Sequence, residues 1–144
     1  MKIAFYKAEY GEWKDKLIAF VTRSKYSHCE IVFEDGMFGS ASPRDSGVRM
    51  KLIEQNEHWD IFELCNTDQT PISSSQEKII RLWFVANEDD KYDWIGAIAS
   101  FFRIDLSKIN KKYCSYVCGL VLLVDPIVTP ARLLKVLNQE HMIK

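Results

Sequence analysis

The sequence predicts an α+β protein, with strands in the first half of the chain and helices in the second. Short alternating segments, separated by turn-forming Asp, Gly and Pro, occupy the first 64 residues. From residue 73 onward, apolar residues recur instead at helical spacing. Such a separation of strands from helices is typical of the α+β class. A length of 144 residues, without a repeat or a linker, predicts one domain over 1–144.

The first half of the chain is expected to contain strands joined by tight turns, and one helix. The strand segments are 2–7, 27–33, 37–42, 48–52 and 59–64, bounded by turn-forming residues. Between the first two, apolar residues at helical spacing predict a helix over 12–22. Asp35 and Gly36 favour the positive φ angles of a hairpin turn. We therefore expect the last four strands to form one antiparallel sheet, with a helix of the second half packed on it.

The second half is expected to contain amphipathic helices. They should begin after Ser73–Ser75, near Asp93, near Tyr113 and after Thr129. Pro126 should end the third, which covers about 113–124, and Pro130 suits the first turn of the last. We expect six apolar side chains in the core, namely Cys29, Cys65, Trp83, Phe84, Phe101 and Phe102.

Charge and composition exclude several classes of function. With 19 basic and 20 acidic side chains, the net charge of −1 gives no electrostatic reason to expect nucleic acid as a partner. No Cys-x-x-Cys pair occurs, which argues against a zinc ribbon, and we expect neither a metal nor a cofactor. No stretch approaches the roughly 20 apolar residues of a membrane span. Because the N-terminus also lacks a signal-peptide pattern, we expect a cytoplasmic protein with free thiols.

Two cysteines in KYCSYVCGLVL (112–122) differ in their expected chemistry. Cys114 falls in the first turn of the predicted helix, where free backbone N–H groups and the helix dipole lower a thiol pKa. Cys118 lies one turn deeper in an apolar stretch, where a thiol is inert. A disulfide between them does not fit the geometry of residues four apart on one helix. Cys114 is therefore the candidate nucleophile and Cys118 a core residue.

A nucleophilic thiol needs a base and a group that orients that base. The chain has three histidines. His28 begins a strand whose other residues look buried, whereas His58 and His141 lie in segments expected to be exposed to solvent. From the residues alone, however, a packing role for Cys114 and a surface role for His28 are the more frequent outcomes.

Four segments together resemble the circularly permuted, lecithin:retinol acyltransferase-like branch of the NlpC-type papain-like cysteine hydrolases. They are SHCEIVFEDG (27–36), SASPRDSGVR (40–49), YDW (92–94) and KYCSYVCGLV (112–121). In that branch the histidine strand precedes the cysteine helix, the reverse of papain. The resemblance implies a permuted papain-like fold in which the cysteine helix packs on an antiparallel sheet. Many relatives of this kind come from bacteria and bacteriophages, which for a phage protein implies the host cytoplasm.

The resemblance implies that Cys114 is the nucleophile and that His28 is the base. A third polar residue on the next strand orients the imidazole in such proteins, and its place here is Ser40. Relatives carry a stronger acceptor there, so Ser40 is a departure from the pattern. Glu30, two residues from His28 on the same strand face, and Asp45, in the following turn, are the alternatives.

The remaining expectations concern the reaction and its substrate. The resemblance places Tyr92 near the active site and implies a hydrolase (amidase, peptidase or thioesterase) or an acyltransferase that uses a thioester at Cys114. The substrate would be a small molecule, a peptide or an acyl compound. Arg44, Asp45 and Arg49 follow the strand expected beside His28. If they border the thiol, the arginines favour a substrate with an acidic group; the alternative, which is the more frequent outcome, is that these side chains only pair with each other on a turn. The alternatives are a non-catalytic phage or bacterial accessory protein that keeps the fold, or a scaffold whose cysteines are all core.

Overall fold

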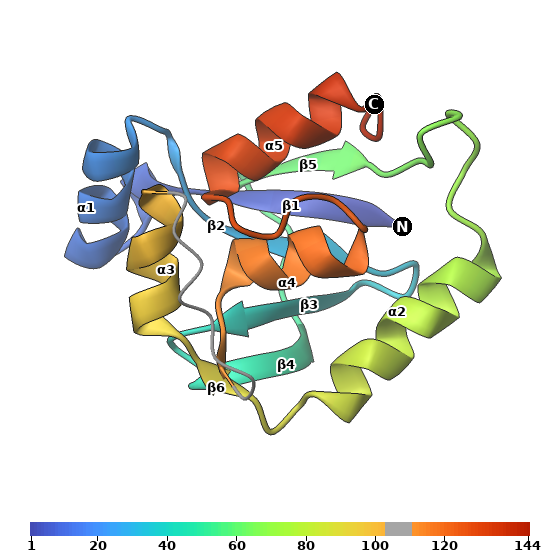
Figure 1. The fold of residues 1–144 in the computed structure, drawn as a ribbon, viewed down its shortest axis with the longest axis horizontal. Coiled ribbons are helices and arrows are strands. Elements are labelled where there is room, and N and C mark those ends of the chain that lie inside the picture. Colours follow the sequence, from blue (N-terminus) through green and yellow to red (C-terminus); the bar gives the residue numbers. More distant parts are fainter. Residues whose placement is uncertain (103–110) are drawn as a thin grey trace.

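The computed structural model describes residues 1–102 and 111–144 and has a mixed α+β fold, which confirms the predicted class (Figure 1). The elements in chain order are β1 (Lys2–Lys7), the short 3-10 helix η1 (Ala8–Tyr10), α1 (Trp13–Thr22), β2 (Tyr26–Val32), β3 (Met37–Ser42), β4 (Gly47–Leu52), β5 (Trp59–Glu63), α2 (Ser74–Ala86), β6 (Lys91–Tyr92), α3 (Trp94–Phe101), β7 (Lys111–Lys112), α4 (Cys114–Val121) and α5 (Pro130–Gln139).

The described strands form one sheet in the order β5-β1-β2-β3-β4-β6-β7. All pairings are antiparallel except that of β6 with β7. The expectation of one sheet is confirmed, with β1 lying between β5 and β2. The strands β6 and β7 were not predicted, because two residues are too few to carry an alternating pattern.

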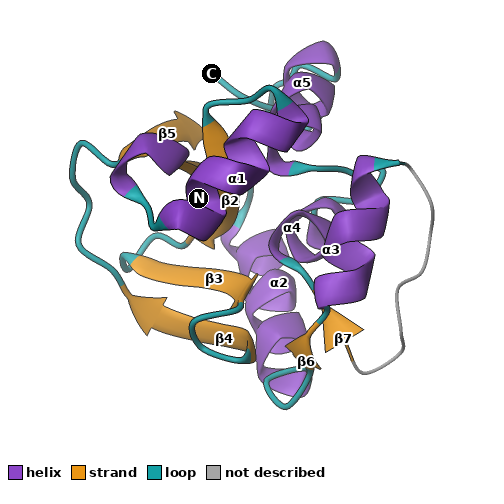
Figure 2. Ribbon diagram, turned by 90° about the vertical axis from the view of Figure 1, so that its left-hand side faces the viewer, coloured by secondary structure: helices purple, strands orange, loops and turns teal. Residues whose placement is uncertain are grey.

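One face of the sheet builds the main core. Alternate residues of β1 and β2 point to this face, and α4 and α5 cover it (Figure 1). In a view turned by 90°, β3 and β4 lie on one side and α2, α3 and α4 on the other (Figure 2). The central side chains are Ile3, Phe5, Cys29, Ile31, Val117, Cys118, Leu133 and Leu137, all fully buried. Burying each large apolar side chain contributes about 1.5–3 kcal/mol, which holds α4 in place.

The opposite face of the sheet is more polar. It carries a small apolar cluster of Ala4, Val32 and Phe38. The side chains of His28 and Glu30 point to this same side of β2, because residues two apart on a strand share a face. The two faces therefore separate the apolar core from the region in which the candidate base lies.

The expected turn and caps are present. Gly36 has a φ of 84°, which favours glycine, in the turn between β2 and β3. The side chain of Ser73 caps α2 by accepting from the N–H of Gln76. Thr129 caps α5 in the same way, with Pro130 in the first position. The ends of these elements were therefore predictable from single residues.

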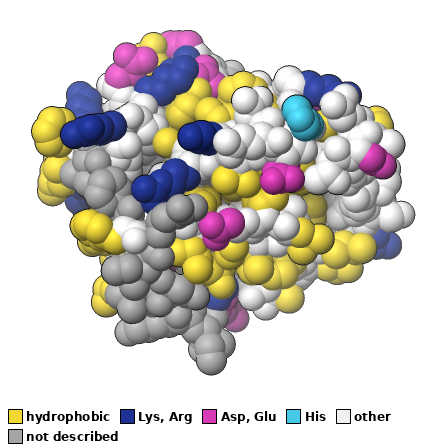
Figure 3. All heavy atoms as spheres, turned by 45° about the horizontal axis from the view of Figure 1, so that its top comes forward, with side chains coloured by type: hydrophobic (Ala, Val, Ile, Leu, Met, Phe, Trp, Pro, Cys, Tyr) yellow, Lys and Arg dark blue, Asp and Glu magenta, His cyan; other side chains and the backbone are white. Residues whose placement is uncertain are grey.

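Some apolar helix residues expected in the core are exposed instead. Phe84 is buried, whereas 66% of Phe102 is exposed; the side chain of Phe101 lies outside the described part of the structure. On α1, Trp13 and Phe20 are 69% and 82% exposed. The reason is position: α1 and α3 lie at one end of the sheet rather than across its face (Figure 1). Hydrophobic atoms are accordingly visible on that side of the surface (Figure 3).

None of the helices within the two described ranges has the length and hydrophobicity needed to cross a membrane.

Candidate active site

Cys114 is the first residue of α4, and the strand before it fixes its position. β7 pairs in parallel with β6, and the Lys112 carbonyl accepts a hydrogen bond from the Asp93 N–H at 2.8 Å. Tyr113 is extended, with a φ of −124°, and the helix begins at the next residue. The N–H groups of a first helical turn have no partner within the helix, and the dipole there favours negative charge. Cys114 therefore occupies the predicted helix-start position, and it is 4% exposed.

The structure brings His28 and Cys114 together. The two groups lie close enough for each to shift the pKa of the other. His28 lies near the start of β2, and its side chain is 14% exposed. The ladder between β2 and β3 covers only the Ile31–Gly39 and Val32–Phe38 pairs, so it ends before His28 is reached. The first turn of α4 reaches the imidazole at this open end of the ladder.

The two partners change each other's ionisation. Hydrogen bonding from Cys29 and the charge of His28 hold the pKa of Cys114 well below its usual value, against the opposing effect of burial. Burial lowers the pKa of His28, but Cys114 and Glu30 outweigh it and raise that pKa to about 10. These two shifts favour a thiolate beside an imidazolium over a neutral thiol beside a neutral imidazole. This charge state is the one that a cysteine nucleophile requires.

Glu30 supports the imidazole from the other side. Its Oε1 lies 3.0 Å from Nε2 of His28, and its carboxylate is 1% exposed. Arg49 donates from Nη1 to Oε2 at 2.6 Å and from Nη2 to Oε1 at 2.7 Å. Burial raises the pKa of Glu30, but His28 and Arg49 outweigh it and lower that pKa. A carboxylate so deeply buried is held in its charged form by these two cations.

Of the three candidates for orienting the imidazole, Glu30 makes the contact, and Ser40 and Asp45 do not. The Ser40 hydroxyl donates to the carbonyl of Cys29 at 2.8 Å. Ser40 is paired with Arg49 across β3 and β4. Because the side chain of Ser40 is small, the guanidinium of Arg49 on β4 can extend across β3 and reach Glu30 on β2.

The expected substrate-binding group divides into two parts. Arg49 is 11% exposed and bonds to Glu30 and, from Nε, to Asp45 at 2.8 Å. Asp45 also pairs with Lys51 at 2.6 Å. These side chains form an ion-pair chain beside His28 and also line the cavity described below, and the expectation that Arg49 and Asp45 bind substrate stays a prediction. Of the three residues, only Arg44 has a largely exposed side chain, which is 58% exposed. Its Nη2 lies 3.1 Å from Oδ2 of Asp15.

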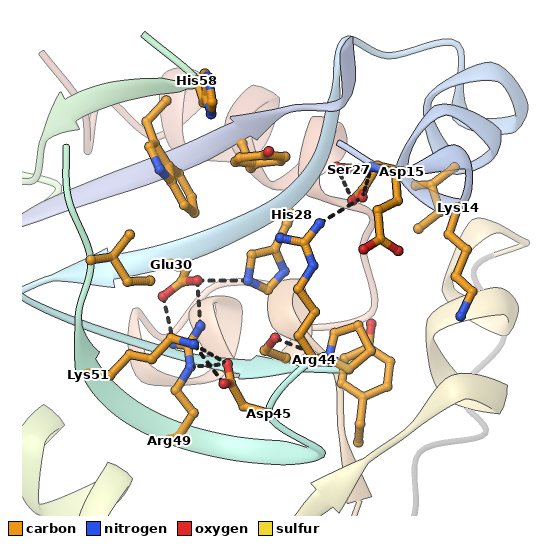
Figure 4. Close-up of a pocket in the computed structure, with 18 of the residues that line it drawn as sticks. Lys14, Asp15, Ser27, His28, Glu30, Arg44, Asp45, Arg49, Lys51 and His58 are labelled. Atoms are coloured by element: carbon orange, nitrogen blue, oxygen red, sulfur yellow. Dashed lines mark hydrogen bonds and ion pairs between the residues drawn. The ribbon is translucent and has the colours of Figure 1, made fainter. Parts of the chain in front are cut away.

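A cavity of about 490 Å³ opens in front of His28 (Figure 4). Its wall includes His28, Glu30, Arg44 and Tyr92. Burial, followed by the charge of Cys114, raises the pKa of Tyr92 well above its usual value. The Tyr92 hydroxyl therefore keeps its proton and can donate a hydrogen bond. Cys114 itself is not in the wall of the cavity, although it raises the pKa values of His28 and Tyr92, which are part of that wall.

Sequence reasoning missed two features of this site. Cys29 was assigned to the core, which its burial confirms, but it also lies close enough to Cys114 to lower the pKa of that thiol. The only signal for this was its position next to His28. Asp15 was not singled out, although it joins α1 to β2 by accepting from the Ser27 hydroxyl at 2.8 Å and also pairs with Arg44. No pattern in the sequence indicates that contact, because it depends on where α1 lies.

Comparison of the chain with known proteins gives no matching family model, no matching curated protein and no matching solved structure. Within residues 1–102 and 111–144, no group of three or more His, Cys, Asp or Glu side chains is arranged to hold a metal ion. The function is therefore argued from the thiol, the imidazole and their neighbours.

Proposed function

We propose that the protein is a cysteine-dependent hydrolase of the permuted papain-like kind that its motifs resemble. It would act on an amide or ester carbonyl through a thioester at Cys114. The observation that carries the proposal is the continuous chain from the Cys114 thiolate through His28 to Glu30 and Arg49. A thiol nucleophile beside a base, with a carboxylate that bonds to that base, is the arrangement that thiol catalysis requires.

The proposed reaction begins with attack by the Cys114 thiolate on the carbonyl carbon. Glu30 occupies Nε2 of His28, which leaves Nδ1 as the nitrogen that exchanges a proton with the thiol and the substrate. The forming oxyanion would accept hydrogen bonds from backbone N–H groups at the start of α4 and from the Tyr92 hydroxyl. The imidazolium then gives its proton to the leaving amine or alcohol as the carbon–nitrogen or carbon–oxygen bond breaks. An acyl thioester and a neutral imidazole remain.

The second half of the proposed reaction releases the acyl group. His28 takes a proton from a water molecule, and the hydroxide adds to the thioester carbonyl. The carbon–sulfur bond breaks, the carboxylic acid leaves, and Cys114 returns to the thiolate facing a protonated imidazole. An amine or alcohol in place of water would make the same site an acyltransferase. Nothing in this sequence of steps needs a cofactor.

The experiment that tests the proposal is acylation by mechanism-based probes. Native protein and Cys114→Ala are treated with thiol-reactive acyl and peptide probes, and the adducts are located by mass spectrometry. We expect a single adduct on Cys114 in the native protein and none in the variant. Unfolded native protein serves as the control for probe reactivity. If Cys114 is labelled only after unfolding, the proposed function is wrong.

The burial of Cys114 favours a second candidate, a non-catalytic accessory protein that keeps the fold. Cys114 is 4% exposed and is not part of the cavity wall, so the structure gives a substrate little direct access to its thiol. A binding protein would not need such access. A small alkylating reagent distinguishes the two candidates, because a catalytic Cys114 should react with it at a pH well below the ordinary thiol value of about 8.5.

A further inference from the structure

Lys14 differs from the other Lys and Arg side chains in the wall of the cavity. Arg44, Arg49 and Lys51 each bond to a carboxylate. Lys14 also belongs to the wall and is exposed, but its ammonium forms no ion pair with any residue in the described part of the chain. An ammonium group has three N–H donors and no acceptor. Lys14 therefore offers the cavity a positive charge that no carboxylate of the described residues neutralises.

The ammonium of Lys14 lies over the rings of two tryptophans. Its Nζ is 5.8 Å from the centre of the Trp13 ring and 5.7 Å from the centre of the Trp94 ring. Both distances are within the roughly 6 Å over which an aromatic face attracts a cation. Trp13 begins α1 and Trp94 begins α3, so the charge is placed where these two helices meet. Figure 4 shows the Lys14 side chain extending away from Arg44.

Trp94 gives this end of the cavity an aromatic surface. It belongs to the wall and is 47% exposed. Its ring meets that of Tyr92 edge-on, with the ring centres 5.0 Å apart. Ile18, one turn after Lys14 on α1, adds an apolar side chain to the same wall. A rigid aromatic side chain lets a ligand bury apolar area at little cost in conformational entropy.

We propose that Lys14 and Trp94 form a substrate-binding subsite for an aromatic group that carries an acidic substituent. Trp94 packs against the aromatic part, and the Lys14 ammonium donates to the acid. This inference rests on the proposed function, for which it names a substrate class. Because Trp94 contacts Tyr92, the bound group lies next to the carbonyl whose oxyanion Tyr92 is proposed to bind. The competing interpretation is that Lys14 only joins α1 to α3.

Lys14 and Arg44 meet an acidic group on different terms. An acid that binds at Arg44 must displace Asp15, which is 3.1 Å away, whereas an acid at Lys14 displaces no carboxylate of the described residues. The ion pair formed at Lys14 is exposed, so it favours an acid over a neutral compound by only about two- to fivefold. The packing on Trp94 supplies most of the affinity, and Lys14 supplies the preference for charge.

The test is a titration with naphthylacetate and with its neutral counterpart naphthylethanol, followed by the indole N–H signals of the isotope-labelled protein at low ionic strength. Neither compound acylates a thiol, so binding is measured apart from catalysis. We expect the Trp94 signal to shift, while that of Trp83, outside the cavity wall, stays in place. The acid should bind about two- to fivefold more tightly than the alcohol. Bound naphthylacetate should also slow acylation of Cys114 by a neutral acyl probe.

Four variants separate the two contacts. Lys14→Gln should abolish the preference for the acid and leave binding of the alcohol unchanged, whereas Lys14→Arg keeps the charge and should keep the preference. Lys16→Gln is the matched control, because it removes a positive charge from the same helix outside the cavity wall. Trp94→Ala should weaken binding of both compounds roughly tenfold.

Several results would overturn the inference. One is equal binding of acid and alcohol by the native protein, and another is a preference for the acid that Lys14→Gln keeps and Arg44→Gln loses. A Trp94 signal that does not shift, or acylation of Cys114 that bound naphthylacetate does not slow, also contradicts it. The proposed function fails in a different way: acyl probes never label Cys114, even though naphthylacetate binds at Lys14 and Trp94 as expected.

Discussion

Glu30 shows how a few contacts stabilise a charge in the interior. A carboxylate that is 1% exposed is unstable unless cations and hydrogen bonds surround it, and His28 and both terminal nitrogens of Arg49 do so here. Arg49 is held in turn by Asp45. The imidazole therefore rests on an ion-pair chain that crosses three strands, which fixes both its orientation and its charge.

Replacing Glu30 by glutamine should damage both stability and thiol reactivity. The change leaves Arg49 buried without its carboxylate, and breaking such a pair costs about 3–5 kcal/mol. It also removes an interaction that raises the pKa of His28, so the pKa of Cys114 should rise. Denaturant unfolding and the pH profile of Cys114 alkylation measure the two effects. Lys51→Gln is the control, because Lys51 bonds to Asp45 but not to Glu30. If Glu30→Gln keeps both the native stability and the native pH profile of alkylation, this role for Glu30 is wrong.

The ionisation of His28 and Cys114 predicts how stability depends on pH. The pKa of His28 is raised from 6.5 to about 10, so its contribution is full below pH 6.5 and is lost as pH rises toward 10. The pKa of Cys114 is lowered, so its contribution is full above its ordinary value of 9.0 and is lost as pH falls. Between pH 6.5 and 9.0, His28 and Cys114 together bind one proton in the folded protein and one in the unfolded protein. In this range the pair therefore does not change the free energy of unfolding as pH changes.

The stabilisation from this pair should therefore be flat between about pH 6.5 and 9 and should fall on either side. It is measured as the difference in free energy of unfolding between the native protein and the double variant His28→Ala, Cys114→Ala. A difference that does not change outside this window means that neither pKa is shifted. A thiolate absorbance that the native protein has at neutral pH and that Cys114→Ala lacks would show that Cys114 is ionised. The shared proton would then be on His28.

At the scale of elements, β6 is the strand that positions Tyr92, and a single glycine lets it approach β4. A Cβ at Gly47 would lie 2.0 Å from the backbone oxygen of Asp90. The N–H of Val48 also bonds to that oxygen at 2.9 Å, and the Tyr92 N–H bonds to the Ser46 carbonyl at 2.9 Å. The contact between β4 and β6 thus depends on the absence of a side chain at this position.

Gly47→Ala should force β6 away from β4 and destabilise the protein by about 1–3 kcal/mol. Because Tyr92 moves with β6, the rate of acylation of Cys114 should fall more than the rate of simple alkylation. Gly36→Ala is the matched control: it is strained by its φ of 84°, but a Cβ there meets no atom within 4 Å. Equal effects of both variants on acylation would show that β6 does not position Tyr92 for the reaction.

The sequence predicted most of the elements but fewer of the contacts between them. Strands of five or more residues carry a clear alternating pattern, and Ser73, Thr129 and Pro130 mark their helices. The pairing of Cys114 with His28 was expected from a helix start, a strand start and a family resemblance. The contact of Arg49 with Glu30 was not expected, because it depends on the register of three strands and on the small size of Ser40. The exposed faces of α1 and α3 also could not be foreseen, since periodicity identifies an apolar face but not its partner.

At the scale of the whole molecule, the cavity brings α1, the turn before β4 and the sheet together around His28 (Figure 4). The cationic side chains of its wall have different roles. Arg49 and Lys51 are occupied by Glu30 and Asp45. Arg44 is more exposed and is bonded to Asp15 of α1. Arg44 is therefore the arginine that can meet an acidic group on a substrate.

Arg44→Ala should selectively slow acylation by probes that carry a carboxylate near the reactive carbonyl. Arg44 is exposed and must give up Asp15, so losing its contact with the probe should cost at most about 1 kcal/mol, a decrease of about fivefold or less. The neutral probe of the same size should be unaffected, and labelling rates of the two probes are compared in each protein. Lys16→Ala on α1 removes a surface charge outside the cavity wall and is the control. An equal decrease for both probes would assign Arg44 to folding.

The ion pair between Arg44 and Asp15 has a consequence for turnover. An acidic substrate would not meet a bare guanidinium, because it would have to replace a carboxylate that is already 3.1 Å away. One exposed ion pair is exchanged for another, and such pairs differ little in free energy. The arginine would then add only modestly to the preference for an acidic substrate over an uncharged one, and it would not bind the correct substrate tightly. Asp15 returns when the acidic product departs, so the step that selects the substrate does not also delay product release.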